Sequence, residues 1–120
     1  MDIIKDFMST PVLSVDVDTP VAEAAKIMQD KDISCLLVNE KEDFVGLITT
    51  TDLVKKVMAE GLNSKTTKVQ SIMSKPVISL NHYLTRSDAN ILMQRNKIKH
   101  LPVTDQKRVV GIITPKDMLS

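Results

Sequence analysis

Short apolar runs and helical stripes of apolar residues alternate along this chain. The first run, at 12–17, is rich in β-branched residues and predicts a short strand. A stripe follows in which apolar residues are spaced at zero, three, four and seven positions: Val21, Ala24, Ala25 and Met28. These positions share one face of a helix, which Thr19 would begin as N-cap, with Pro20 at the first helical position.

Two further apolar runs, at 36–38 and 44–48, come after this helix and are separated by the polar segment 39–43. Two apolar runs joined by a short polar tip predict a β-hairpin. A second helix is expected to start near Asp52 and to end at Gly61, because glycine readily takes a positive φ after a helix.

The same order of elements returns 65 residues later. Residues 77–80 match the first run, and the runs at 101–103 and 109–113 flank a polar tip at 104–108. Between them, a helix start signal is followed by an apolar stripe: Thr85 and Asp88, then Ala89, Leu92 and Met93. Identical residues also stand at equivalent positions of the two opening segments: Met8, Ser9, Pro11 and Val12, then Met73, Ser74, Pro76 and Val77. Such an internal repeat predicts two copies of one structural unit.

We therefore predict a mixed α/β (α+β) fold of two β-α-β-β-α repeats. The first repeat covers 1–62, a linker covers 63–68, and the second repeat covers 69–120, with its last helix cut short at Ser120. A unit of about 55 residues buries too little surface to be stable alone, so we expect the repeats to fold together as one globular module. Four methionines stand in register and are expected to fill the core: Met8, Met28, Met73 and Met93.

Charge and composition argue against several classes of partner. The 120 residues include 16 Lys and Arg and 15 Asp and Glu, interspersed, for a formal net charge of +1. No field of one sign favours nucleic acid or an anionic membrane, and Phe7, Phe44 and Tyr83 are too scattered to form a base-stacking platform. The single cysteine, Cys35, excludes an intrachain disulfide. Without a membrane-length apolar stretch or a signal-peptide pattern, we expect a cytoplasmic protein.

The strongest candidate for chemistry is a repeated segment, Gly-Leu-Ile-Thr-Thr-Thr-Asp at 46–52 and Gly-Ile-Ile-Thr-Pro-Lys-Asp at 111–117. Each copy lies where a strand passes into a helix, whose first turn has unpaired N–H groups that favour a phosphate. The Thr hydroxyl would add a phosphate contact, and the carboxylate of Asp could accept both hydroxyls of a ribose. Thr-x-x-Asp is also a capping box, which stabilises a helix without binding a ligand. The sequence leaves both interpretations open.

Lys99 and His100 precede the second hairpin, at the positions that Ser34 and Cys35 hold in the first copy. Their charge could meet a phosphate, or they could be ordinary surface residues. Cys35 and His100 without a carboxylate companion make a poor metal site, so no metal is expected. The sequence also contains no nucleophile with an evident base, and we expect no catalysis.

These features resemble the CBS domain, the motif named after cystathionine β-synthase. The resemblance rests on both copies of Met-Ser-x-Pro-Val, of Ile-x-x-Leu-x-Val (33–38 and 98–103) and of the closing Gly, Thr and Asp. It covers nearly the whole chain. CBS domains occur in tandem pairs, or Bateman modules, that are related by pseudo-twofold symmetry, bind adenosine-containing ligands and usually dimerise into a flat disc.

The resemblance implies two clefts between the repeats. In one, Asp117 would hold the ribose and Thr114 the phosphate, with Lys99 lending charge. Because Pro115 lacks an N–H, this cleft would depend more on Thr114 and Lys116. Residues from the first copy would flank the adenine there: Leu13, Ile33 and Ser34. In the other, Asp52 takes the ribose and Thr49 the phosphate beside Thr51. Residues from the second copy would complete that cleft: Ile78, Ile98 and either Lys99 or His100.

The resemblance thus implies a non-catalytic regulatory module that senses an adenine nucleotide or other adenosyl compound, such as AMP, ADP, ATP, NAD or S-adenosylmethionine. No cofactor is obligatory, and a homodimer without membrane contact is expected. Two alternatives remain: a structural dimerisation or protein-interaction module with empty clefts, and a nucleic-acid-binding module.

Overall fold

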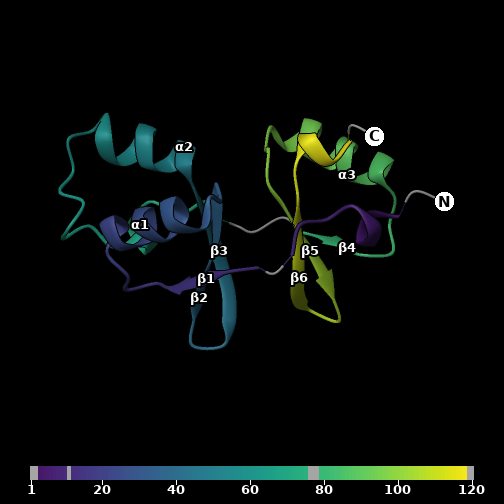
Figure 1. Cartoon of the computed structure of the whole chain (residues 1–120), viewed down its shortest axis with the longest axis horizontal. Helices are drawn as coiled ribbons and strands as arrows, with labels where there is room; N and C mark the ends of the chain where they lie inside the picture. The colour runs from purple at the N-terminus through teal and green to yellow at the C-terminus, as the bar shows by residue number, and fades with distance from the viewer. Residues whose placement is uncertain (1–2, 11, 76–78, 119–120) are drawn as a thin grey trace. The chain divides into compact units, whose positions relative to one another are not determined.

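The structure, a computed structural model, describes residues 3–10, 12–75 and 79–118, which fall into two compact units (Figure 1). The first unit contains the described residues of Leu13–Val77. The second contains the described residues of Met1–Val12 and of Ile78–Ser120. Each unit combines a three-stranded sheet with helices, which confirms the predicted α/β class.

In the first unit, β1 (Ser14–Asp16) pairs in parallel with β2 (Cys35–Glu40), and β2 pairs antiparallel with β3 (Asp43–Thr49). Two parallel neighbours need a crossover connection, and helix α1 (Val21–Lys31) provides it. After β3 the chain passes directly into α2 (Thr50–Asp52). This helix continues as the π-helical segment η2 (Leu53–Met58), and the 3-10 turn η3 (Val69–Ser71) comes later. The predicted order of strand, helix, hairpin and helix is confirmed.

The second unit repeats this arrangement. Its sheet has the order β4 (Leu80–Asn81), β5 (Leu101–Asp105) and β6 (Arg108–Ile113), again parallel and then antiparallel. Helix α3 (Arg86–Asn96) connects β4 to β5, and the short turn η4 (Pro115–Met118) follows β6. Both hairpins have a register irregularity at equivalent places, after Val38 and after Val103. The repeat read from the sequence therefore extends to the detail of the strand pairing.

The opening segment of each sequence repeat packs in the unit of the other repeat. The turn η1 (Ile4–Asp6) belongs to the second unit, where Ile4 N–H donates to the Leu84 carbonyl at 2.8 Å. Ser9 exchanges backbone hydrogen bonds of 2.8 and 3.2 Å with Ile112, and Ser74 exchanges equivalent bonds with Leu47 in the first unit. The boundaries of the compact units therefore differ from those of the sequence repeats at 1–62 and 69–120, because each opening segment belongs to the unit of the other repeat.

Each unit has its own apolar core. The first is formed by buried side chains of α1, the sheet and η3, including Val21, Met28 and Ile48. The second includes Ile4 of the opening segment with Met93 and Leu101. Full burial of such a side chain contributes roughly 1.5–3 kcal/mol relative to exposure.

The repeated methionines fill core space, as predicted. Met28 and Met93 are buried. Met73 and Met8 are partly buried and pack against Gly46 and Gly111.

Helix α1 begins one residue later than the sequence predicts. Pro20, not Thr19, is the N-cap, and it makes no side-chain capping bond. The first helical N–H groups instead donate to the 63–68 segment: Val21 to the Thr67 carbonyl at 2.8 Å and Ala22 to Ser64 at 2.9 Å. The segment predicted as a linker therefore caps α1 by backbone contacts that the local sequence does not encode.

Other boundaries differ by a few residues. The first predicted strand shortens to Ser14–Asp16, and residues 77–78 of its counterpart lie outside the described residues. The second helix begins at Thr50 rather than at Asp52, and Gly61 follows its end with φ of 68°. None of the helices in the described part of the chain combines the length and the apolar character needed to cross a bilayer.

Candidate functional site

The first Thr-x-x-Asp segment forms a tight corner where β3 ends and α2 begins; we call it the Asp52 corner. Oδ2 of Asp52 accepts from the Thr49 backbone N–H at 3.0 Å and from the Thr49 hydroxyl at 3.1 Å. In return, Asp52 N–H donates to the Thr49 hydroxyl oxygen at 3.2 Å. The capping-box interpretation is therefore confirmed here, and it fixes the orientation of the carboxylate.

The β2 strand and the residue before it support this corner. Thr50 N–H donates to the Ser34 carbonyl at 3.1 Å, and Cys35 is paired with Thr49 across the β2–β3 ladder. Burial, together with the smaller effect of the negative charge on Asp52, raises the pKa of the Cys35 thiol to about 12. Cys35 is thus a neutral thiol at physiological pH, which makes it a poor nucleophile and a poor metal ligand.

A lysine that sequence reasoning did not single out completes the Asp52 corner. The Lys56 ammonium lies 3.0 Å from Oδ1 of Asp52 and donates to the Ile72 carbonyl, also at 3.0 Å. The Asp52 side chain is only 8% exposed. The signal was available in the sequence, because Asp and Lys four residues apart lie on the same side of a helix.

The second Thr-x-x-Asp segment forms the equivalent Asp117 corner between β6 and η4. Oδ2 of Asp117 accepts from the Thr114 backbone N–H at 2.8 Å and from its hydroxyl at 3.3 Å. Asp117 is half-buried, and no described residue pairs with its Oδ1. The two corners thus share the orientation of one carboxylate oxygen and differ at the other.

A third Thr-x-x-Asp pair shows the capping role outside the predicted site. Thr85 caps α3, and Oδ2 of Asp88 accepts from the Thr85 N–H at 3.0 Å and from its hydroxyl at 2.9 Å. These hydrogen bonds hold the pKa of the Asp88 carboxyl below its usual value. Local geometry of this kind is therefore not sufficient evidence for a ligand site.

The remaining predicted residues divide between the units. Ile33 and Ser34 directly precede β2 in the first unit, which also contains Leu13 and the exposed Thr51. In the second unit, the residues preceding β5 are partly buried Ile98, exposed Lys99 and partly buried His100, while Lys116 is exposed on η4. Ile78 lies outside the described residues. The two predicted clefts draw on residues of both units and stay predictions.

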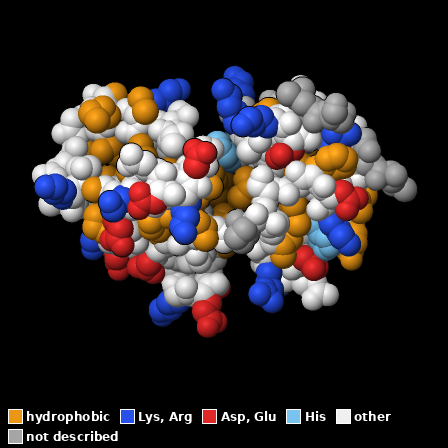
Figure 2. Space-filling model, in the orientation of Figure 1, with side chains coloured by type: hydrophobic (Ala, Val, Ile, Leu, Met, Phe, Trp, Pro, Cys, Tyr) orange, Lys and Arg blue, Asp and Glu red, His pale blue; other side chains and the backbone are white. Residues whose placement is uncertain are grey.

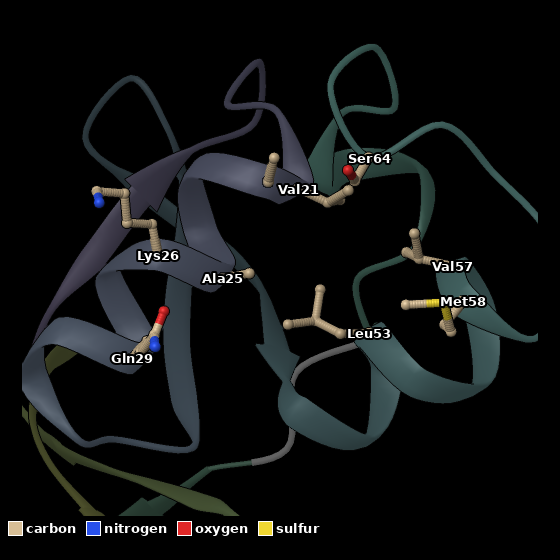
Figure 3. Close-up of a pocket in the computed structure, with 9 residues that line it drawn as sticks. Val21, Ala25, Lys26, Gln29, Leu53, Val57, Met58 and Ser64 are labelled. Carbon is tan, nitrogen blue, oxygen red and sulfur yellow. The ribbon is translucent and has the colours of Figure 1, made fainter.

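A separate hollow of about 440 Å³ lies in the first unit between α1 and η2 (Figure 3). Val21, Ala25 and Gln29 line it from α1, and Leu53, Val57 and Met58 line it from the facing helix. None of the predicted site residues is among its lining. Within the described residues, no three His, Cys, Asp or Glu side chains lie close enough together to hold a metal ion.

Comparison with protein families and with curated proteins gives a consistent result. The CBS domain model matches residues 4–59 and 69–120. The CBS domain-containing protein YhcV of Bacillus subtilis is 31% identical over 118 residues, which cover 98% of this chain and 84% of YhcV. Inosine-5'-monophosphate dehydrogenase of Methanocaldococcus jannaschii is 35% identical over 119 residues, but this chain covers only 22% of that enzyme.

Solved structures share the fold over nearly the full chain. A hexameric CBS-CP12 protein from bloom-forming cyanobacteria matches with a TM-score of 0.92 and 32% identity, covering 99% of this chain and 70% of that one. The CBS domain pair of protein MJ0100, in complex with 5'-methylthioadenosine and S-adenosyl-L-methionine, matches with a TM-score of 0.86 and 30% identity, covering 97% and 91%. The chain therefore belongs to the CBS-domain family and is a tandem pair of CBS domains, a regulatory module.

Proposed function

We propose that this chain is a non-catalytic sensor of an adenosyl compound, such as AMP, ADP, ATP, NAD or S-adenosylmethionine. The observation that carries the proposal is the similarity of this chain, over 97% of its length, to a CBS domain pair of solved structure. The Asp117 corner adds a candidate site in the repeated segment, because its carboxylate is held in one orientation and its Oδ1 pairs with no described residue. The MJ0100 pair, whose structure is similar, is described in complex with two adenosyl ligands.

The chemistry of the corner suits a ribose. An ionised carboxylate accepts about four hydrogen bonds, and two of these positions at Asp117 are filled by Thr114. Oδ1 can then accept both hydroxyls of a ribose diol. Because the capping bonds fix the side chain before a ligand arrives, little rotamer entropy is lost on binding.

Positive charge in the second unit favours ligands that carry a phosphate over ligands that carry a cationic sulfonium. Lys99 and Lys116 are both exposed and both belong to the unit that contains the Asp117 corner. Two ammonium groups favour the phosphates of AMP, ADP or ATP over the cationic sulfonium of S-adenosylmethionine. We therefore expect the nucleotides to bind more tightly, and raised salt to weaken them.

A ligand of about 23 heavy atoms that gains about 0.3 kcal/mol per atom would bind with a dissociation constant near 10 μM. Ligand at about 100 times that value would stabilise the folded chain by about 2.7 kcal/mol. Such a gain raises the melting temperature by several degrees for a chain of this size. A thermal-shift panel with the five compounds therefore tests the proposal.

Asp117→Asn is the informative variant in this panel, since it keeps the shape of the side chain and weakens its acceptor. The matched control is Asp88→Asn, which alters a capping box of nearly the same geometry that is not a predicted ligand site. We expect Asp88→Asn to lower the melting temperature but to keep the ligand shift. Loss of the shift in both variants, or no shift of the parent chain with any compound, would contradict the proposal.

The competing functions predict different results. A structural dimerisation module would form a homodimer and show no ligand shift. A nucleic-acid-binding module would bind short RNA or DNA with a steep salt dependence, yet Figure 2 shows basic and acidic side chains interspersed over the visible face. A homodimer stays a prediction, and light scattering would test it, with the hexamer of the CBS-CP12 neighbour as one possible assembly.

A further inference from the structure

We infer that the two corners are not equivalent and that Lys56 closes the Asp52 corner, so that one adenosyl ligand binds per chain, at the Asp117 corner. This inference depends on the proposed function. It adds which of the two repeated Thr-x-x-Asp segments binds the ligand and names the residue that decides it.

The difference lies in one oxygen atom. At both corners Oδ2 of the aspartate is filled by the N–H and the hydroxyl of the preceding threonine. Oδ1 is therefore the oxygen left for a ribose. At Asp52 this oxygen is 3.0 Å from the Lys56 ammonium, whereas at Asp117 no described residue pairs with it.

Occupancy by Lys56 removes one of the two acceptor positions that a ribose diol needs. A ligand at the Asp52 corner would also have to break the ion pair between Lys56 and Asp52, whereas a ligand at the Asp117 corner meets no such pair with a described residue. Displacement of Lys56 is therefore a cost that only the Asp52 corner carries.

Lys56 is also held from its other side. Its ammonium donates to the Ile72 carbonyl at 3.0 Å, so displacement would break two contacts and not one. Ile72 is itself buried in the core of the first unit, and its backbone position is fixed by that packing. The lysine thus connects the start of the α2–η2 helix to the segment around η3.

The Asp117 carboxylate is also more accessible to a ligand than the Asp52 carboxylate. The Asp52 side chain is 8% exposed, while Asp117 is half-buried. A ligand that reaches the Asp52 carboxylate would have to move the Lys56 side chain, which is itself 45% exposed and has room to swing into solvent once its charge or length is changed. Shortening or neutralising Lys56 should therefore open the corner.

The test is isothermal titration calorimetry of the whole chain with AMP, ATP and S-adenosylmethionine as probes. We expect one ligand per chain for the parent, an affinity lowered about tenfold or more by Asp117→Asn, and an affinity changed less than about twofold by Asp52→Asn. Lys56→Met should raise the stoichiometry to two. Lys55→Met is the matched control, because Lys55 is exposed on the same helix and makes no ion pair with any described residue, and it should keep the stoichiometry at one.

Loss of the Asp52 ion pair could unfold the Lys56→Met variant, so amide NMR shifts of the parent chain provide a second measurement. Addition of a probe should shift the Thr114 and Asp117 signals and leave those of Thr49 and Asp52 unchanged. Two ligands per parent chain, equal losses in Asp52→Asn and Asp117→Asn, or one ligand in a folded Lys56→Met variant would each overturn this inference and leave the proposed function intact. No binding by any probe would overturn both.

Discussion

Substitution of Gly111 by alanine tests the exchange of opening segments between the repeats. A Cβ added at Gly111 would collide with Sδ of Met8 and lie 2.7 Å from its Cγ and 3.1 Å from its Cβ. The backbone at Gly111 does not have the positive φ that disfavours alanine, so the effect is steric. Overpacking of this kind costs about 1–3 kcal/mol, and we expect Gly111→Ala to destabilise the chain by that amount.

Met8→Ala should relieve most of this cost. The single Met8 variant loses part of a half-buried side chain, roughly 1–2 kcal/mol. In the double variant the new methyl group occupies space that the Met8 side chain leaves, so the two effects should fall short of their sum by about 1 kcal/mol or more. Urea unfolding followed by far-UV circular dichroism gives the four free energies of the cycle.

The sequence repeat provides the control. Met73 is the counterpart of Met8, but it packs against Gly46, where an added Cβ would lie 2.6 Å from its Sδ. Gly111→Ala and Met73→Ala should therefore be additive within about 0.5 kcal/mol. Coupling of Gly111 to Met73 but not to Met8 would refute the exchange, since it would place each opening segment on the sheet of its own sequence repeat.

Three further predictions concern single residues. Because the pKa of Asp88 is lowered in the folded chain, its ionised carboxylate stabilises the fold above the unfolded pKa near 3.8, and this stabilisation is lost as the pH falls through the folded pKa. The urea concentration at half-unfolding, measured between about pH 2 and 6, should therefore fall less steeply toward acid pH in Asp88→Asn than in the parent chain, and the same pH dependence in both would contradict this. The raised pKa of Cys35, about 12, predicts that iodoacetamide at pH 8 alkylates the native chain far more slowly than the urea-unfolded chain, and equal alkylation rates would contradict burial of the thiol. The neutral thiol should also favour folding below about pH 9 and lose that effect as the pH rises toward 12. Lys97 follows α3 with φ of 55°, a conformation that costs a non-glycine residue about 1 kcal/mol. Lys97→Gly should therefore raise the free energy of unfolding in urea titrations by about 0.5–1 kcal/mol, and a lower free energy of unfolding would contradict this.

The elements that the sequence predicts well are those encoded by local patterns. The stripe from Val21 to Met28 and the paired apolar runs are periodic over one element, so they predict α1 and the hairpins to within a few residues. The start of α1 was misplaced because its N–H groups are satisfied by Thr67 and Ser64, more than forty residues away. A cap provided by a distant backbone leaves no local signal.

The exchange of opening segments was invisible for a different reason. Met8 and Met73 have matching neighbours, so either could pack on either glycine as far as the sequence shows. The repeated Gly46 and Gly111 are explained only when the structure places a methionine side chain where each Cβ would be. Pairwise packing between repeats is a tertiary property, and similar halves make it ambiguous.

The candidate site was predicted in part. The sequence identified both Thr-x-x-Asp segments, and their geometry as capping boxes or close relatives is confirmed by the distances at Thr49 and Thr114. It distinguished the two clefts by Lys99 and His100 in the second copy and by Pro115, whereas the structure shows a difference at the carboxylates themselves, caused by Lys56. The spacing of Asp52 and Lys56 indicates such a pair, but only the structure shows that it occupies the free oxygen.

The central claim is that Oδ1 of Asp117 accepts the ribose hydroxyls of an adenosyl ligand, and the affinities of AMP and 2',3'-dideoxy-AMP for the parent chain and for Asp117→Asn test it most directly. Hydrogen bonds to a charged group contribute about 1.5–3 kcal/mol each, so removal of the diol should weaken binding to the parent chain by about tenfold or more. The same removal should change binding to Asp117→Asn much less. Equal weakening in both proteins would contradict the claim, because the ribose would then be held by a group other than Asp117.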